Sequence, residues 1–206
     1  MRREGALHQA ASGPAIYNFL TAMHQLDYDP EFLMETNLYS TQLSAFNTNG
    51  YADKVHIRSA FIPLEEADAV PAVQQYIDIV QRAGGSTGPI GEQAASSFLL
   101  WATAAKSCGS GLTRQCMVNY LAKVHDWTGG GLHAPADPGD NKPPACGVLI
   151  KLTGTKFSRE YPQKRGTFDC DPKYIAKVPQ ALWGVALNPD RLATQFLTPS
   201  VIKPQS

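Results

Sequence analysis

The stretch "SGPAIYNFLTAMHQLDYDPEFLME", residues 12–35, predicts a helix that runs directly into a strand. Ser12 is a suitable N-cap, and Pro14 suits the first turn of a helix. An apolar stripe with helical spacing follows, made by Ile16, Phe19, Leu20 and Met23. Pro30 disfavours helix at the residue before it, and "EFLME" then predicts a short strand. A helix followed by a strand is the repeating unit of an α/β domain.

The same alternation continues downstream. Residues 40–47 predict a short helix starting at Ser40, and residues 54–61 predict a strand by their period-2 alternation. Three helices follow, predicted over residues 68–83 (opened by Asp68), 91–107 and 112–124 (capped by Thr113). The helix at 91–107 is apolar nearly all round, which is typical of a buried helix. Residues 147–152 and 156–161 predict a hairpin. We therefore expect an α/β fold with a largely parallel sheet flanked by helices, ending in a hairpin and an irregular, Pro-rich tail.

Composition excludes several classes of function. The chain has 206 residues, and 18 Lys and Arg balance 18 Asp and Glu. A neutral chain without a basic block gives no reason to expect nucleic acid or an anionic membrane as partner. The N-terminus lacks the apolar core of a signal peptide. The even number of cysteines, four, favours two disulfides and an oxidising compartment, with three pairings open.

The loop "WTGGGLHAPADPGDNKPPAC", residues 127–146, carries no recognisable chemistry. Its three consecutive glycines neither follow a strand nor open a helix, as a phosphate cradle requires. A metal site would draw on His125, Asp126, His133, Asp137 and Asp140. Their spacing matches neither a zinc motif nor a calcium loop. We expect a surface connection here, without metal or cofactor.

Catalytic signatures are also missing. The chain has no GxSxG elbow, and the acidic pair Glu65-Glu66 falls in a predicted loop, where solvation explains it. We therefore expect a binding protein and not an enzyme. A small secreted enzyme is kept as a third alternative.

In open α/β sheets, ligands bind beyond the carboxyl ends of the strands. Glu35, Thr36 and Asn37 follow the first predicted strand, and Ser12 begins the first helix. Glu92 and Gln93 open the helix at 91–107, where polar residues are either caps or ligand contacts. The candidate ligand-binding residues are Ser12, Glu35, Thr36, Asn37 and Gln93. Capping and turn formation are the competing explanation for each.

A resemblance adds to this interpretation. The order of "GPAIYNFLTAMHQLDYDPEFLMETNLYS", "GYADKVHIRSAF", "VQQYIDIVQRAGG", "LTRQCMVNYLAKV" and "WTGGGLHAPADPGDNKPPACGVLIKLTGTKFSREYP" resembles the C-terminal half of type I periplasmic binding proteins. The nearest class is the branched-chain amino acid (Leu/Ile/Val) group. The resemblance covers residues 12–162, which leaves residues 1–11 as a divergent N-terminus and residues 163–206 as a tail. It implies a partial second lobe, with the first lobe and the opening strand absent.

The resemblance implies a function as well. It predicts the substrate-binding component of an ABC importer, which binds a small polar solute and meets the transporter permease in the full-length protein. The location would be extracellular or periplasmic, with a membrane anchor if that protein is a lipoprotein. A ligand-sensing regulatory domain of the same fold is the alternative.

In that family an acidic residue near Glu35 meets the ammonium group of an amino acid. Gln93 stands where many members carry an aromatic residue, which leaves amides and peptides open as solutes.

Locality predicts the disulfide pairing. Cys108 closes one predicted helix and Cys116 lies in the first turn of the next, so these two are expected to pair. Cys146 and Cys170 would then join the start of the hairpin to the tail.

Overall fold

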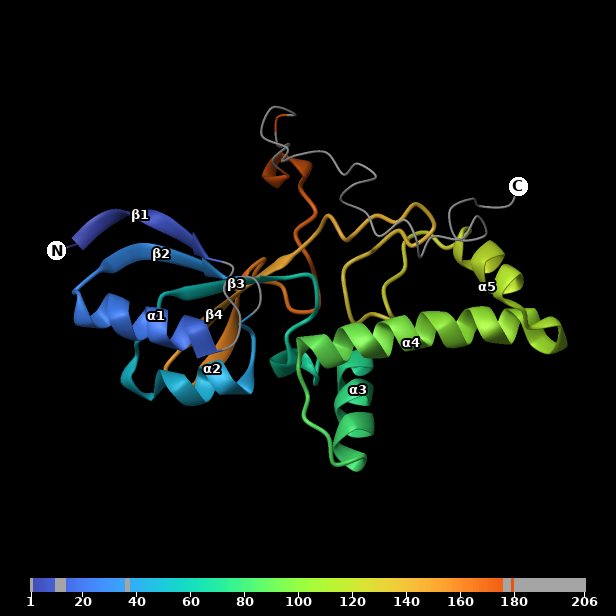
Figure 1. Cartoon of the computed structure of the whole chain (residues 1–206), viewed down its shortest axis with the longest axis horizontal. Coiled ribbons are helices and arrows are strands. Elements are labelled where there is room, and N and C mark those ends of the chain that lie inside the picture. The colour runs from blue at the N-terminus through green and yellow to red at the C-terminus, as the bar shows by residue number, and fades with distance from the viewer. Residues whose placement is uncertain (1, 10–13, 36–37, 176–178, 180–206) are drawn as a thin grey trace, which may run out of the picture. The chain divides into compact units, whose positions relative to one another are not determined.

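A computed structural model describes residues 2–9, 14–35, 38–175 and 179 (Figure 1). The elements are β1 (Arg2–Gln9), α1 (Pro14–Gln25), β2 (Asp29–Glu35), α2 (Thr41–Phe46), β3 (Val55–Ser59), α3 (Pro71–Arg82), α4 (Pro89–Cys108), α5 (Arg114–Leu121), β4 (Val148–Thr153) and β5 (Lys156–Tyr161). Short 3-10 turns occupy Asn47–Asn49, Leu64–Glu66, Gly109–Gly111 and Pro172–Tyr174. The chain forms two units, Met1–Pro172 and Lys173–Ser206. All helices and strands named here belong to the first unit.

The five strands form one mixed sheet in the order β1-β2-β3-β4-β5. β1 and β3 each run parallel to β2, whereas β4 is antiparallel to both β3 and β5. The α/β class is confirmed, but the prediction of a largely parallel sheet holds only for the first three strands. Strands β4 and β5 are antiparallel because only two residues lie between Thr153 and Lys156, and a connection this short cannot join parallel strands.

The strand β1 corrects a second expectation. The first helix was expected to have no strand before it, yet Arg2–Gln9 pairs with β2 along most of its length. This segment contains two Arg, a Glu and a His, so its sequence shows neither an apolar run nor clear alternation. Within the described sheet β1 is an edge strand, a position where charged residues are common.

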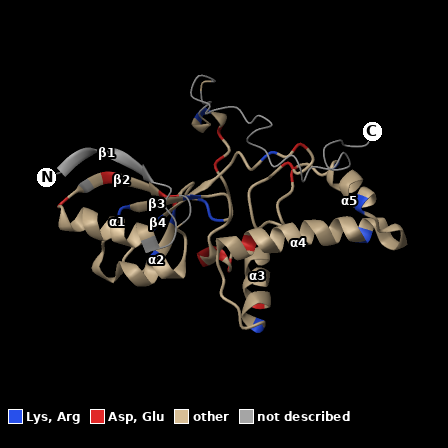
Figure 2. Cartoon of the chain, viewed as in Figure 1, with Lys and Arg blue, Asp and Glu red and all other residues tan. Residues whose placement is uncertain are grey.

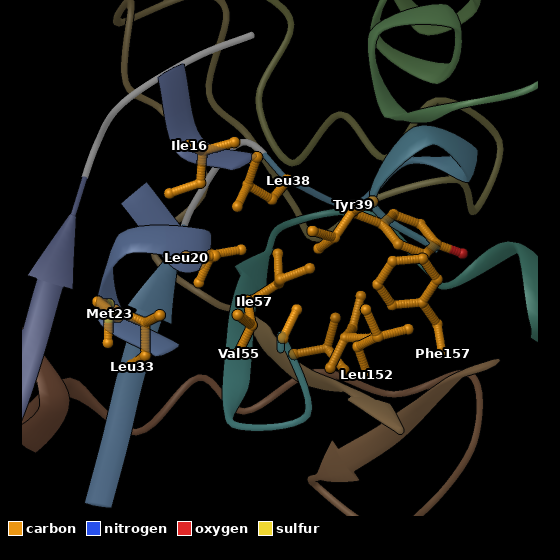
Figure 3. Close-up of a cluster of buried hydrophobic side chains, with 14 residues drawn as sticks. Ile16, Leu20, Met23, Leu33, Leu38, Tyr39, Val55, Ile57, Leu152 and Phe157 are labelled. Atoms are coloured by element: carbon orange, nitrogen blue, oxygen red, sulfur yellow. The ribbon is translucent and has the colours of Figure 1, made fainter. Parts of the chain in front are cut away.

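Helices α1 and α2 cover one face of the sheet and form the main core (Figure 3). Ile16, Leu20 and Met23 of α1 are buried against Leu33 of β2 and Val55 of β3. Side chains of Leu152 and Phe157 extend this core to the hairpin, as the close-up shows. The predicted apolar stripe of the first helix therefore faces the sheet, apart from Phe19, which is only partly buried against the core.

Local capping determines where several helices begin. The Ser40 hydroxyl accepts a hydrogen bond from Leu43 N at 3.1 Å, and the Thr113 hydroxyl accepts one from Cys116 N at 3.1 Å. The predicted cap at Thr113 is confirmed, and Ser40, expected to start its helix, is the N-cap of α2. Asp68 does not open α3, because the helix begins at Pro71 with Val70 at the N-cap. Asp68 lies instead in a turn over residues 67–69, between the 3-10 turn Leu64–Glu66 and the helix.

Helix α4 is less buried than its composition predicts. Its buried residues are Glu92, Ser96 and Ala104, whereas Phe98 is 68% exposed and Trp101 is 52% exposed. Figure 2 shows few charges along this helix, and its end turns hold Glu92 and Lys106. The expectation of a helix buried all round is therefore wrong for the described chain. Among the described residues, no helix is both long and apolar enough to cross a membrane.

Both predicted disulfides are present. Cys108 is bonded to Cys116 across the turn between α4 and α5, with Cα atoms 6.1 Å apart. Cys146 is bonded to Cys170, and their Cα atoms are 4.2 Å apart. The second bond joins the residues just before β4 to the segment after β5, as predicted from locality.

Candidate functional site: an acidic pocket

A pocket of about 260 Å³ lies beside α2 and the turn between β4 and β5. Tyr39 and Ser40, which follow β2, line it together with Leu64 and Glu65, which follow β3. Residues Thr155–Phe157 of the hairpin and Thr87–Gly88 before α4 complete the wall.

A second pocket, of about 320 Å³, lies at the amino ends of β2 and β3. Pro30 near the start of β2 and Val55 at the start of β3 line it. Its floor includes His24 and Tyr51, whose rings stack with centroids 4.0 Å apart. The two pockets share no lining residue, although Asp53 of the second accepts a hydrogen bond at 2.9 Å from Gly154 N, next to Thr155 of the first.

Tyr39 is the structural centre of the acidic pocket. Its hydroxyl donates to Glu65 Oε2 at 2.5 Å and accepts from Leu64 N at 2.6 Å. Its ring is 5% exposed and packs edge-on against Phe157, with centroids 4.9 Å apart. Burial, followed by the charge of Glu65, raises the pKa of Tyr39 well above its usual range. The phenol therefore stays protonated and acts as a fixed hydrogen-bond donor to Glu65.

Two further carboxyl groups surround this donor. Glu65 is exposed as a residue, but its carboxyl group is partly desolvated. Desolvation raises the pKa of Glu65, whereas the hydrogen bond from Tyr39 lowers it. Glu92 is fully buried in the first turn of α4, and burial, with the charge of Glu65, raises the pKa of Glu92 to about 8. At neutral pH the buried Glu92 therefore retains its proton.

The start of α4 is held in place by Tyr76 of α3. The Tyr76 hydroxyl donates to Gly88 O at 3.0 Å and accepts from Gly88 N at 3.1 Å. A Cβ at Gly91 would lie 2.1 Å from the same hydroxyl, so no larger residue fits there without displacing Tyr76. These contacts place Glu92 one turn after the pocket-lining Gly88.

The residues predicted from the sequence have mixed outcomes. Ser12, Thr36 and Asn37 lie outside the described residues. Glu35 is buried at the end of β2, and Gln93 is exposed in the first turn of α4, next to Glu92. Neither Glu35 nor Gln93 lines the pocket, so the described part of the predicted set does not define it.

The prediction that solvation alone explains Glu65 and Glu66 was wrong. Glu66 is 3% exposed and pairs with Arg159, while Glu65 lines the pocket with Tyr39. No local motif marks either role, because their partners lie 93 and 26 residues away in the sequence. The Pro-Leu-Glu-Glu sequence after a strand was the only signal, and it is shared by ordinary turns.

The loop at 127–146 is more than a surface connection. Leu132, His133 and Ala134 are buried, and the His133 Nδ1–H donates to Ala134 O at 2.7 Å. His133 Nε2 therefore accepts from the Ser96 hydroxyl at 2.7 Å, and Ser96 accepts from Trp127 Nε1 at 2.9 Å. Burial lowers the pKa of His133, so the imidazole is neutral.

This Ser-His pair has the spacing of a nucleophile and its base. Ser96 is only 4% exposed and His133 only 6%, and neither lines the two pockets described above. A substrate would have no access to the hydroxyl. The network fixes the loop to α4 and gives no support for catalysis.

Three of the five residues considered for a metal site do come together. Donor atoms of His125, Asp137 and Asp140 lie within 4.8 Å of one another. His125 Nδ1 is 2.6 Å from Asp137 Oδ1, and the Lys142 ammonium group pairs with Asp140 and lies 3.8 Å from Asp137. Lys142 already supplies the positive charge that these carboxylates require, so the cluster is explained without an ion.

Comparison with known proteins leaves the family open. No protein-family model matches the sequence. No curated protein matches it either.

Proposed function

We propose that the chain forms one wall of a solute-binding cleft in the substrate-binding component of an ABC importer. The solute is a small polar molecule such as an amino acid or an amide. The permease of the transporter is the protein partner of the full-length protein. The resemblance to the second lobe of type I periplasmic binding proteins is the origin of this proposal.

One observation supports the proposed function most strongly. The pocket beside α2 and the hairpin turn combines an exposed carboxylate, Glu65, with a buried hydroxyl donor, Tyr39. An apolar wall, which includes Leu64 and Phe157, lies beside them. Small-molecule sites typically have this composition, a mostly apolar surface with a few convergent polar groups.

The two disulfides favour the importer over the regulatory alternative. Disulfides persist in secreted and periplasmic proteins and are rare in the cytosol, where a ligand-sensing transcriptional regulator would work. Sequencing the gene upstream of this chain separates the two functions. A signal peptide with a lipobox Cys supports the importer, and a cytoplasmic start supports the regulator.

Affinity provides the direct test. A single wall leaves a polar solute largely hydrated, so each hydrogen bond contributes only about 0.5–1.5 kcal/mol. Association costs at least ~4 kcal/mol in translational and rotational freedom. We expect the 206-residue chain to bind no better than about millimolar, and a longer polypeptide that includes a first lobe to bind at about micromolar or tighter.

Calorimetry with a panel of amino acids, amides and short peptides measures both affinities. Glu65→Gln should weaken binding in both polypeptides because it removes the charge at the pocket. Glu31→Gln is the matched control, since Glu31 is an exposed acid of β2 outside the pocket. Failure of the longer polypeptide to bind any member of the panel would contradict the proposal, as would equal effects of the two substitutions.

A further inference from the structure

The segment that follows β5 is bonded to the turn that carries Glu65. We call this segment, residues 163–170, the strap. The Arg165 guanidinium group in the strap donates to both carboxylate oxygens of Asp68, and it donates to Glu65 O at 3.0 Å. Glu65 lines the acidic pocket, so the strap holds part of the pocket wall directly.

The middle of the strap is packed as well as hydrogen-bonded. Gly166 N donates to Glu66 Oε2 at 2.7 Å, next to Glu65 in the sequence. Phe168 is half-buried and packs against both hydrophobic clusters, the one under the sheet and the one that contains Tyr76 of α3. Leu64, which lines the pocket, packs against the same two clusters. The strap and the pocket wall therefore rest on the same two cores.

A disulfide and two backbone hydrogen bonds hold the far end of the strap. Cys170 is bonded to Cys146, which lies just before β4. Asp169 and Gly147 donate to each other's carbonyl oxygens at 2.9 and 3.0 Å. Cys146 is 8% exposed, whereas Cys170 is an exposed residue. Cys170 is therefore the side of this disulfide that faces solvent and that a thiol can approach.

We propose that the Cys146–Cys170 disulfide is a redox latch, which holds the strap against the pocket wall when oxidised and releases it when a dithiol reduces it. A thiolate of the dithiol attacks Cys170 Sγ, and Cys146 leaves as a thiolate that takes up a proton. The second thiol of the reductant then displaces Cys170 from the mixed disulfide. The reductant leaves as an intramolecular disulfide, and the protein gains two thiols.

Release of the strap follows from what remains after reduction. Arg165 and Asp68 form an exposed ion pair, and such pairs hold two segments together only weakly in water. Reduction also restores the chain freedom that a closed loop with a separation of 24 residues denies. The strap can then open locally while the rest of the fold stays intact. Leu64 N, which donates to the Tyr39 hydroxyl at 2.6 Å, is the amide that reports loosening of the pocket wall.

Hydrogen exchange measured by NMR on the 206-residue chain tests the latch. The reporter is Leu64 N, and the reference is Leu33 N of the main core, which donates to Lys54 O at 3.3 Å. Dithiothreitol, a dithiol, should raise the exchange rate of Leu64 N relative to Leu33 N by at least about tenfold. Reoxidation by oxidised glutathione should reverse the increase. Alkylation of the free thiols, followed by peptide mapping, identifies the disulfide that has opened.

Two double variants separate the disulfides, because dithiothreitol can open either of them. Cys146→Ala/Cys170→Ala should show the increased ratio of the two exchange rates without reductant, and dithiothreitol should add nothing further. Cys108→Ala/Cys116→Ala is the matched control, since that bond joins α4 to α5 and lies outside the strap. It should keep the wild-type ratio and the wild-type response to dithiothreitol.

Single substitutions in the strap test the same contacts with both disulfides intact, and they decide the matter even if a double variant does not fold. Arg165→Gln removes the bonds to Asp68 and Glu65 and should raise the ratio by about threefold. Lys164→Gln removes the neighbouring exposed cation, whose side chain makes no described hydrogen bond, and should leave the ratio unchanged.

Four results would overturn the inference. They are an unchanged ratio when Cys146–Cys170 is opened, an equal increase in the Cys108/Cys116 variant, a Cys146–Cys170 bond that dithiothreitol leaves intact in the folded chain, and an Arg165→Gln protein that behaves like Lys164→Gln. None of these measurements uses a solute. The latch therefore goes beyond the proposed function, and either can fail while the other stands.

Discussion

Arg159 and Glu66 form a buried, two-pronged ion pair. Arg159 Nε lies 2.5 Å from Glu66 Oε1, and Arg159 Nη2 lies 2.8 Å from Glu66 Oε2, with the side chains 5% and 4% exposed. Gly166 N adds a third hydrogen bond to the carboxylate at 2.7 Å, and Arg159 Nη1 donates to Thr167 O at 2.8 Å. The pair joins the turn after β3 to strand β5 and to the segment that follows β5. It thereby fixes the backbone on both sides of Glu65.

Glu66→Gln is expected to reduce the free energy of unfolding by about 3–5 kcal/mol, because it leaves the Arg159 charge buried without its counterion. Urea unfolding at pH 7 measures the loss. Asp68→Asn is the matched control, since Asp68 pairs with Arg165 at an exposed position and its loss should have a much smaller effect than that of Glu66. Equal losses in the two variants would contradict a special role for the buried pair.

The parts of the fold that local sequence determines were predictable. Ser40 and Thr113 cap helices through residues three positions away, and the Thr153–Lys156 turn closes a hairpin within four residues. The disulfide from Cys108 to Cys116 spans only a helix end and the start of the next helix. In each case the two partners lie within about ten residues, so a short stretch contains the whole interaction.

The parts that depend on distant partners were not predictable. Glu66 meets Arg159 from 93 residues away, and Tyr39 meets Glu65 from 26 residues away. Glu92 could be read as a helix cap because its burial depends on elements far from its own turn. Strand β1 was missed for a related reason, since its pairing with β2 and not its own composition makes it a strand.

Ser96→Ala is expected to destabilise the fold by about 1–3 kcal/mol. It removes the hydroxyl between His133 Nε2 and Trp127 Nε1, and it leaves both ring nitrogens buried without a partner. Thermal or urea unfolding measures the effect. Ser97→Ala, one position along the same helix at an exposed site, should be neutral or slightly stabilising. A tolerated Ser96→Ala would show that water replaces the hydroxyl.

The two disulfides should contribute unequally. Cys146–Cys170 closes a loop with a separation of 24 residues, and Cys108–Cys116 one with a separation of 8. Loop-closure entropy alone gives about 3.5 kcal/mol for the longer loop and about 2.5 kcal/mol for the shorter. Paired Cys→Ala variants, compared by urea unfolding without reductant, measure both contributions. A larger loss from the Cys108/Cys116 variant would contradict the loop-entropy account.

Glu92 should make stability depend on pH, and Glu92→Gln should remove that dependence. Burial raises the pKa of Glu92 from an ordinary value of 4.5 to about 8, so the folded chain binds this proton more tightly than the unfolded chain does. The stabilisation by the proton is complete below the unfolded pKa, and it is lost as pH rises towards 8. Between pH 5 and pH 9 the wild-type protein should lose on the order of 3–4 kcal/mol relative to Glu92→Gln, whose amide stays neutral.

Urea unfolding at pH 5, 7 and 9 tests this difference, because the other titrating groups are common to both proteins and cancel. Glu31→Gln, which removes an exposed carboxyl, should follow the wild-type profile at all three values. Parallel profiles for wild type and Glu92→Gln would mean that Glu92 is ionised in the folded chain at neutral pH. The buried carboxylate would then require a compensating group that the described residues do not supply.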